Sequence, residues 1–224
     1  FQFPVGNEHL ALGAWVSGYM VAYKVSGIDY VAYASSQSRS RLVPVSYAEL
    51  VNNSSEVVVK VVTKTSDNLI TLTQTFTFNR HDKFVDIQTD IANVSANAVT
   101  DVVFKSYADW DTDSDFSTNW DYDLSRNMIY AWKTRYTAIA SSRVPDLMDI
   151  DGWSDYGQRN TIVNYPSGPV MGYDGLEILH FALGNLPAGG STLVETIYGA
   201  GTSLADLQGA IDRGAKLRWL DISP

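Results

Sequence analysis

Cysteine is absent from the 224 residues of this sequence. Its absence excludes a disulfide framework, a thiol nucleophile, and zinc or iron sites held by cysteine. If the chain works outside a cell, then packing, bound ions, glycans or neighbouring molecules must supply the stability that small exported proteins often obtain from disulfides.

Charge is also scarce, and most of it is negative. Asp, Glu, Lys and Arg make up 18% of the residues, and the formal net charge is −9. The excess lies in residues 101–160, which contain eleven aspartates against six lysines and arginines. This balance argues against a nucleic-acid partner, because the phosphates would be repelled.

Long hydrophobic runs are missing too. The most apolar stretch, residues 10–25, is interrupted by glycine, serine and lysine, so no membrane span is predicted. The composition, with 45% hydrophobic residues, is typical of an extracellular β protein. A removed export signal or excision from a longer chain would each explain why Phe1 is not methionine. The composition favours the first, and we expect an extracellular or cell-surface location.

What the sequence does contain is period-2 alternation of apolar and polar residues. It runs through residues 56–65, 68–78 and 83–91, each bounded by short turn sequences, and residues 99–107 follow. Such alternation predicts antiparallel strands with one covered face. We expect these segments to form a four-strand meander.

Further strands are expected on both sides of this meander. They comprise a hairpin within residues 10–34 that turns at Ser26 and Gly27, an edge strand at 42–47 containing Pro44, strands at 127–132 and 136–142, and a last hairpin from 175–183 and 191–200. Residues 143–160 are expected to form a long acidic connection. Residues 203–216 are expected to form a helix, with Ser203 and Asp206 as its capping box.

These elements predict an all-β fold, an antiparallel β-sandwich with one C-terminal α-helix. A large, supersandwich-like arrangement is one form that this fold could take. At this length one domain over residues 1–224 is expected, with an acidic insertion at about 108–160.

Residues 91–107, IANVSANAVTDVVFKSY, and 183–198, LGNLPAGGSTLVETIY, resemble repeated β-sandwich modules of prokaryotic surface and cell-wall proteins. The segment from residue 197 to 216, and the DWD after a strand, are similar to exported proteins with surface anchors. The resemblance covers about a third of the chain. It implies an exported β-sandwich and carries no catalytic residues with it. The chain departs from the modules in being about twice as long and in carrying the acidic segment.

Six aspartates crowd into residues 108–123 and form a candidate cation site: Asp109, Asp111, Asp113, Asp115, Asp121 and Asp123. Alternating carboxylates in a turn suit calcium, with Asp149 or Asp151 as further ligands. The segment is not an EF-hand, because Phe116 and Tyr122 occupy the positions of the required glycine and glutamate. The alternative is a solvated acidic loop in which some aspartates act as turn or cap residues.

Tryptophans near the acidic segment could stack on a sugar, and the candidates are Trp110, Trp120 and Trp153. The competing interpretation is packing in the core. An acid and base pair of His180 with Glu177 or Glu195, as in mutarotase-like sandwiches, is weakened because Glu177 and His180 would lie on opposite faces of one strand. The histidines show no metal-binding spacing.

Asn52, Asn53 and Asn93 each begin an N-x-S sequence in an expected turn, which makes them candidate glycosylation sites. The leading hypothesis is a non-enzymatic extracellular structural protein, a subunit of a fibre, pilus-like filament or surface layer that calcium stabilises. Self-association could use residues 1–7 as a donated strand. The alternative hypothesis is a secreted carbohydrate-binding or carbohydrate-processing β-sandwich.

Overall fold

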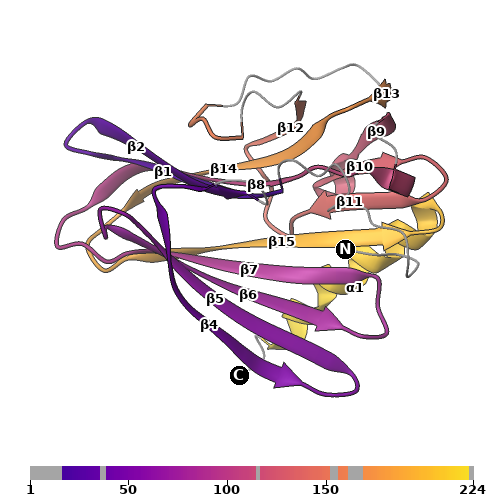
Figure 1. Cartoon of the computed structure of the whole chain (residues 1–224), viewed down its shortest axis with the longest axis horizontal. Coiled ribbons are helices and arrows are strands. Elements are labelled where there is room, and N and C mark those ends of the chain that lie inside the picture. Colours follow the sequence, from indigo (N-terminus) through magenta and orange to yellow (C-terminus); the bar gives the residue numbers. More distant parts are fainter. Residues whose placement is uncertain (1–16, 36–38, 115–116, 152–155, 161–168, 222–224) are drawn as a thin grey trace.

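The computed structural model describes residues 17–35, 39–114, 117–151, 156–160 and 169–221. Its strands form two antiparallel sheets (Figure 1). In spatial order the nine-stranded sheet contains β13 (Val170–Tyr173), β9 (Thr118–Asp123), β10 (Met128–Trp132), β11 (Tyr136–Ala140), β15 (Ser191–Gly201), β7 (Phe84–Asn93), β6 (Ile70–Asn79), β5 (Glu56–Thr65) and β4 (Leu42–Asn52). The six-stranded sheet contains β12 (Leu147–Asp151), β14 (Leu176–Leu186), β8 (Val99–Ala108), β1 (Gly18–Val25), β2 (Ile28–Ser35) and β3 (Arg39–Ser40).

The two sheets face each other across one apolar core, so the predicted all-β sandwich is confirmed. Every second residue of the inner strands points into this core, as the alternation in the sequence requires. Buried members from the two sheets include Val21, Phe104 and Phe181 on one side and Leu72 and Ile139 on the other.

The predicted four-strand meander is correct for three strands and wrong for the fourth. β5, β6 and β7 are neighbours, but β7 pairs next with β15, and β8 lies in the other sheet between β14 and β1. The alternation could not reveal this, because β8 is buried on both faces: Phe104 faces the core, and Tyr107 faces a second cluster outside the sheet.

The predicted last hairpin is also wrong, because β14 and β15 are consecutive strands in opposite sheets. Their connection crosses the sandwich beside the connection from β7 to β8. The side chain of Asn93 holds the two together: its Nδ2 donates to the carbonyl oxygens of Leu186 at 3.0 Å and Pro187 at 2.9 Å. The backbone nitrogen of Gly189 donates to the Asn93 carbonyl at 3.0 Å.

The expected acidic connection at residues 143–160 contains a strand, β12, which pairs with β14 at the edge of the six-stranded sheet. Residues 108–160 as a whole supply β9, β10 and β11 to one sheet and β12 to the other. This acidic region therefore contributes to both layers of the sandwich.

The hairpin of β1 and β2 forms as expected, with Ser26 and Gly27 at positive φ values of 50° and 80° in its turn. Gly18 begins β1 where a side chain could not fit, because an added Cβ would overlap the carbonyl of Ala34. Pro44 lies in β4, which is the edge strand that the sequence predicted.

Helix α1 (Leu204–Asp221) follows β15 and packs on the outer face of the nine-stranded sheet (Figure 1). One half of the predicted capping box is present, because the Asp206 backbone nitrogen donates to Ser203 Oγ at 3.2 Å. The Asp206 carboxylate accepts instead from the nitrogen of Thr202, the residue before the N-cap, at 2.8 Å. Leu207 and Ile211 are buried against the sheet. Among the described residues, no helix has the length and apolar character needed to cross a membrane.

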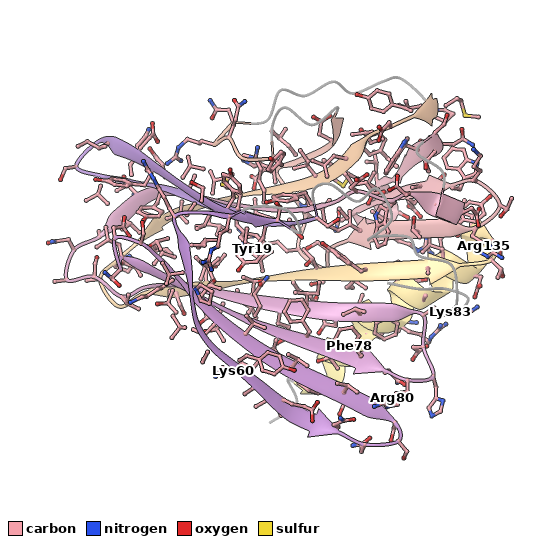
Figure 2. The ribbon with its side chains drawn as sticks, in the orientation of Figure 1. Tyr19, Lys60, Phe78, Arg80, Lys83 and Arg135 are labelled. Carbon is pink, nitrogen blue, oxygen red and sulfur yellow. The ribbon has the colours of Figure 1, made fainter. Side chains whose placement is uncertain are left out.

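The nine-stranded sheet extends past the six-stranded one, and β4, β5 and β6 fan out beyond it (Figure 1). Phe76 and Phe78 share the inner face of β6, in register with Ile87 and Val85 of β7. Ile87 and Val85 are 6% exposed, whereas Phe78 is 39% exposed. Figure 2 shows Phe78 on the part of the sheet that fans out. The sandwich therefore opens toward this side.

Candidate functional site

Of the five predicted aspartates that the structure describes, two lie in one acidic group, together with a third aspartate that the sequence did not suggest. Asp109 and Asp111 follow β8, with side chains that are 1% and 2% exposed. Asp174, between β13 and β14, brings its carboxylate into the same group, in which one oxygen of each residue lies within 4.8 Å of the others. Three carboxylates this close could hold a metal ion.

Other members of the predicted site have structural roles. Asp113, in the 3₁₀ turn η1 (Thr112–Ser114), accepts hydrogen bonds from Thr134 and Arg135 in the β10–β11 turn. Partial burial raises the pKa of Asp113, but these hydrogen bonds outweigh it and hold the pKa below its usual value. Asp121 accepts from Tyr130 Oη at 3.3 Å. Asp115 lies outside the described residues.

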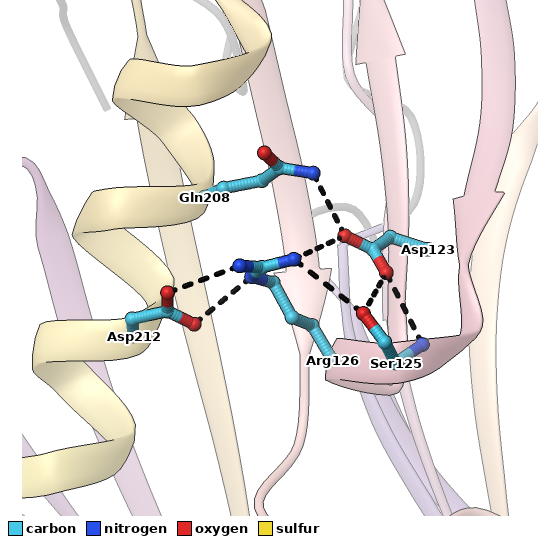
Figure 3. A network of polar contacts seen from close by, with 5 residues as sticks. All are labelled: Asp123, Ser125, Arg126, Gln208 and Asp212. Atoms are coloured by element: carbon cyan, nitrogen blue, oxygen red, sulfur yellow. Dashed lines mark hydrogen bonds and ion pairs between the residues drawn. The ribbon is translucent and has the colours of Figure 1, made fainter.

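Asp123 belongs to a network that fastens α1 to the sheet (Figure 3). It caps the 3₁₀ turn η2 (Leu124–Arg126), where its Oδ1 accepts from Ser125 N at 3.1 Å. Its Oδ2 accepts from Arg126 and from Gln208 of α1, each at 2.9 Å. Arg126 also forms a bidentate pair with Asp212, at 2.9 and 3.1 Å. The cap interpretation of the aspartates is therefore correct at this position.

Asp149 cannot complete the acidic group. In β12 it lies opposite Ile178 of β14, on the outer face of the six-stranded sheet. Asp151 ends the same strand. The third carboxylate of the group belongs instead to Asp174, which is distant in sequence and had no local pattern to mark it.

A buried carboxyl group lies beside the acidic residues. Glu177 is fully buried, and its Oε2 accepts hydrogen bonds from Trp110 Nε1 at 2.7 Å and from the Ile139 nitrogen at 3.1 Å. Its Oε1 has no hydrogen-bond partner among the residues that the structure describes. Burial, with a smaller contribution from the negative charge of Asp109, raises the pKa of Glu177 well above its usual value. The sequence offered no signal for this contact beyond a charged residue in an apolar strand.

Two of the three predicted sugar-stacking tryptophans are buried. Trp110 is 0% exposed and Trp120 is 1% exposed. Each satisfies its indole nitrogen internally, Trp110 on Glu177 and Trp120 on the carbonyl of Tyr173 at 2.8 Å. Neither ring offers a face to a ligand, so the structure assigns both to the core. Trp153 lies outside the described residues.

The open side of the sandwich contains a cleft between the sheets. Its volume is about 220 Å³. It is lined by aromatic, aliphatic, hydroxyl and amide groups from Ser17, Gly18, Tyr19, Gln74, Phe76, Ile87, Ser106 and Tyr198. Tyr19 extends from the six-stranded sheet toward the nine-stranded one, where its hydroxyl lies 3.1 Å from Thr63 Oγ1 (Figure 2). The cleft therefore combines apolar walls with a few polar groups.

The cleft and the acidic group adjoin each other. Ser17 lines the cleft, and its Oγ accepts a hydrogen bond from the Asp109 nitrogen at 3.1 Å. Tyr198 lines the cleft, and its ring packs edge-on against Trp110 with centroids 5.5 Å apart. A change in the acidic group would therefore alter the positions of side chains at one end of the cleft.

The proposed acid and base pairs do not come together. Glu177 points into the core, whereas His180 lies on the outer face of the same strand, opposite Lys105 of β8. Burial lowers the pKa of His180 to about 4, and the nearby charges of Lys105 and Arg159 add to the effect. Glu195, two residues before Ile197, faces the side of the nine-stranded sheet that α1 covers.

The candidate glycosylation sites differ in access. Asn52 and Asn53 are exposed, although Asn52 Oδ1 accepts from Arg80 at 2.8 Å, and Asn53 Oδ1 accepts from Ser55 N at 2.8 Å and Glu56 N at 2.9 Å. Asn93 is fully buried, and its Nδ2 donates to three carbonyl groups. A glycan cannot be attached to Asn93 in the folded chain, so this prediction is corrected.

Comparisons with known proteins relate the chain by fold alone. No protein-family model matches it, and no curated protein matches it. Among solved structures, it is similar to a bacterial glucoamylase in complex with acarbose, at a TM-score of 0.65 and 12% identity, covering 89% of this chain and 28% of the glucoamylase. It is also similar to a polysaccharide lyase, at a TM-score of 0.55 and 14% identity, with the same coverage of 89% and 28%.

The chain thus spans 28% of the length of each of these two proteins. The β-sandwich part of the resemblance to exported modules is borne out. The glucoamylase and the polysaccharide lyase are each matched over only part of their length.

Proposed function

We propose that the chain is a carbohydrate-binding β-sandwich domain and that its ligand site is the cleft between the two sheets. One observation carries the proposal: the cleft brings Tyr19, Phe76 and Tyr198 together with the amide of Gln74 and the hydroxyls of Ser17 and Ser106.

This set of groups suits a sugar ring. A pyranose has one face of C–H groups that packs on an aromatic or aliphatic surface, and an edge of hydroxyls that both donate and accept hydrogen bonds. Gln74 has an acceptor oxygen, and its Nε2 has a second hydrogen beside the one that it donates to Thr89 Oγ1 at 3.2 Å. The hydroxyl of Ser106 can donate and accept. Gln74 and Ser106 are 5% and 4% exposed, so each is held by the surrounding packing. Binding therefore requires little ordering of these side chains.

The same lining favours binding over hydrolysis. Cleavage of a glycosidic bond uses a pair of carboxyl groups on either side of the bond. The described residues that line the cleft include no aspartate or glutamate. Glu177, a carboxyl group with a raised pKa beside the acidic residues, is fully buried and accepts a hydrogen bond from Trp110.

The fold comparisons support a role in carbohydrate recognition without specifying it. One of the similar proteins is a glucoamylase in complex with acarbose, and another is a polysaccharide lyase. This chain matches only part of each. A role as one domain of a larger carbohydrate-active protein outside the cell is part of the proposal. Assembly into fibres through donated residues 1–7 stays a prediction, and these residues lie outside the described part of the chain.

The cation of the acidic group is calcium in this proposal. Three carboxylates supply hard oxygen ligands, and two of them are buried at the end of β8. Calcium accepts such ligands in flexible geometry, with backbone carbonyls or waters completing the sphere. An ion here would neutralise like charges and hold Asp109 and Ser17 at the end of the cleft.

The proposal is tested by a glycan array with the wild-type protein and two variants. Phe76→Ala removes a ring from the cleft. Phe78→Ala removes a ring from the same face of β6 that does not line the cleft, and serves as its control. We expect wild type and Phe78→Ala to bind the same glycans and Phe76→Ala to lose at least tenfold in affinity, about 1.4 kcal/mol. Absence of glycan binding by the wild type would overturn the proposal.

A further inference from the structure

A cluster of three aromatic rings lies on the outer face of the nine-stranded sheet, on the side away from the cleft. Tyr130 and Trp132 come from β10, and Tyr136 comes from β11 directly opposite Trp132. The rings of Trp132 and Tyr136 are stacked, with an interplanar angle of 10° and centroids 6.4 Å apart. Tyr130 lies 5.4 Å from Trp132, tilted by 35°. We call these three residues the outer aromatic platform.

Tyr130 is 8% exposed and belongs to the buried cluster beneath α1, whereas the other two rings of the platform are only partly covered. The inner edge of the platform packs on the cluster beneath α1, which includes Met128 and Leu207. Trp132 and Tyr136 are half-buried, and the charged turn at Lys133 and Thr134 beside them is exposed. Two nearly parallel rings are thus fixed by packing while part of their surface stays open to solvent.

Polar groups border the platform on the neighbouring strand. The register of β9 with β10 places Asn119 opposite Trp132 and Asp121 opposite Tyr130, on the same face of the sheet. Asn119 Oδ1 accepts from the Gly172 nitrogen at 3.0 Å, and its Nδ2 donates to no other described residue. Asp121 accepts from Tyr130 Oη. An amide donor and a carboxylate acceptor therefore lie beside the rings, on the neighbouring strand β9.

We infer that the outer aromatic platform is a second glycan-contact surface, which makes the domain bivalent for a polymeric carbohydrate. This inference rests on the proposed function of the cleft and adds the class of ligand. The C–H face of a pyranose would lie on Trp132 and Tyr136. Its hydroxyls would donate to Asp121 and accept from Asn119.

A carbohydrate fits this surface better than an apolar protein partner. A dry protein interface over the rings would also remove Asp121 and Asn119 from water, and leaving such groups without partners is costly. A sugar supplies both donors and acceptors at its rim. The platform is also small, with three rings, whereas a stable protein interface takes about 20–30 residues on each side.

Two contact surfaces on opposite sides of one sheet have a measurable consequence. A short soluble oligosaccharide can occupy only one of them, whereas an insoluble polysaccharide offers many chains. Linked sites bind such a ligand with an avidity that exceeds the affinity of either site alone. Loss of the platform should therefore weaken retention on polymers more than binding of oligosaccharides.

The test measures retention of the protein on insoluble starch, cellulose, chitin and xylan, in parallel with soluble oligosaccharides of the same sugars. Trp132→Leu and Tyr136→Leu remove the aromatic faces but keep apolar packing. Tyr47→Leu, at a 68% exposed tyrosine of β4 outside both sites, is the matched control. Melting temperatures identify any variant that is not folded. Asn119→Ala is an additional platform variant, because it removes the amide beside the rings and leaves the rings intact.

We expect wild type and Tyr47→Leu to be retained on one of the polymers. Trp132→Leu and Tyr136→Leu should lose at least tenfold in retention, with oligosaccharide binding changed by less than about twofold. If folded platform variants are retained as well as wild type, or if wild type binds oligosaccharides but no polymer, the inference is wrong while the cleft proposal stands. If the wild type binds neither, both are wrong.

Discussion

The indole nitrogen of Trp110 donates a 2.7 Å hydrogen bond to Glu177, and neither side chain is exposed to solvent. The bond joins the acidic segment after β8 to a central strand of the sandwich. Since the Ile139 nitrogen donates to the same oxygen, one carboxyl oxygen satisfies two buried N–H groups from different elements.

Two substitutions of Glu177 distinguish its role as a hydrogen-bond acceptor from its role in filling space in the core. Glu177→Gln keeps an acceptor for both N–H groups and resembles the neutral acid that the raised pKa favours, so we expect little loss of stability. Glu177→Leu leaves both donors unpaired in the core, at a cost of about 2–5 kcal/mol. Urea unfolding measures both changes. Equal stability of the two variants would mean that the Trp110 contact is not formed in solution.

The lowered pKa of His180 predicts that the fold loses stability in acid. Burial lowers the pKa of His180 from 6.5 to about 4, with Lys105 and Arg159 acting in the same direction and Asp146 opposing them. The unfolded chain therefore takes up a proton at higher pH than the folded one. The contribution of His180 to stability is complete above pH 6.5 and is lost as pH falls to about 4, by roughly 3 kcal/mol.

His180→Gln cannot take up this proton, so its melting temperature should fall less than that of wild type between pH 6.5 and 4. His81→Gln, at an exposed histidine, is the control and should follow wild type. Parallel curves for all three proteins would contradict a buried, neutral His180.

Calcium should stabilise the fold through the acidic group. The melting temperature is expected to rise with the logarithm of the calcium concentration and to return on addition of EDTA, with a gain of about 2.7 kcal/mol at 100 times the dissociation constant. Asp174→Asn should remove the response, because Asp174 is one of three carboxylates in the group. Asp90→Asn, at a half-buried aspartate of β7 that is not part of the group, is the control. Failure of millimolar calcium to shift the melting temperature would rule out this site.

Local patterns in the sequence identified most strands and the helix, but they could not assign strands to sheets. Alternation in residues 56–91 predicted β5, β6 and β7 correctly because apolar residues recur at every second position on the inner face of each strand. The sheet change between β7 and β8 depends on Asn93, whose side chain binds carbonyl groups 93 and 94 residues away along the chain. No short-range pattern contains that information.

The candidate site was predicted in part for the same reason. The density of aspartates drew attention to Asp109 and Asp111, which do form a group, but Asp174 joins them only through the pairing of distant strands. Their nearness to the aspartates suggested that Trp110 and Trp120 could stack on a sugar, but both side chains are buried in the core. The cleft consists of residues from β1, β6, β7, β8 and β15 together with Ser17, and its members share no spacing along the chain.

Replacement of glycine by alanine should have opposite effects on stability at two positions of α1. Alanine favours a helix over glycine by about 0.5–1 kcal/mol. At Gly209 an added Cβ would meet only the flexible end of Arg213 at 3.5 Å, so Gly209→Ala should stabilise by that amount. At Gly214 it would lie 2.9 Å from Ile197 and 3.1 Å from Phe84, both in the sheet beneath. Overpacking of this kind costs about 1–3 kcal/mol, so Gly214→Ala should destabilise.

Because both positions lie in one helix, the propensity gain cancels when the two variants are compared, and the difference reports how closely α1 packs on β7 and β15. Urea unfolding gives this difference as a shift in midpoint at an unchanged slope. If Gly214→Ala were as stabilising as Gly209→Ala, the helix would have to lie farther from the sheet in solution. In that case the buried contact of Ile211 with the sheet would also have to loosen, since Gly214 and Ile211 are three residues apart and face the same strands.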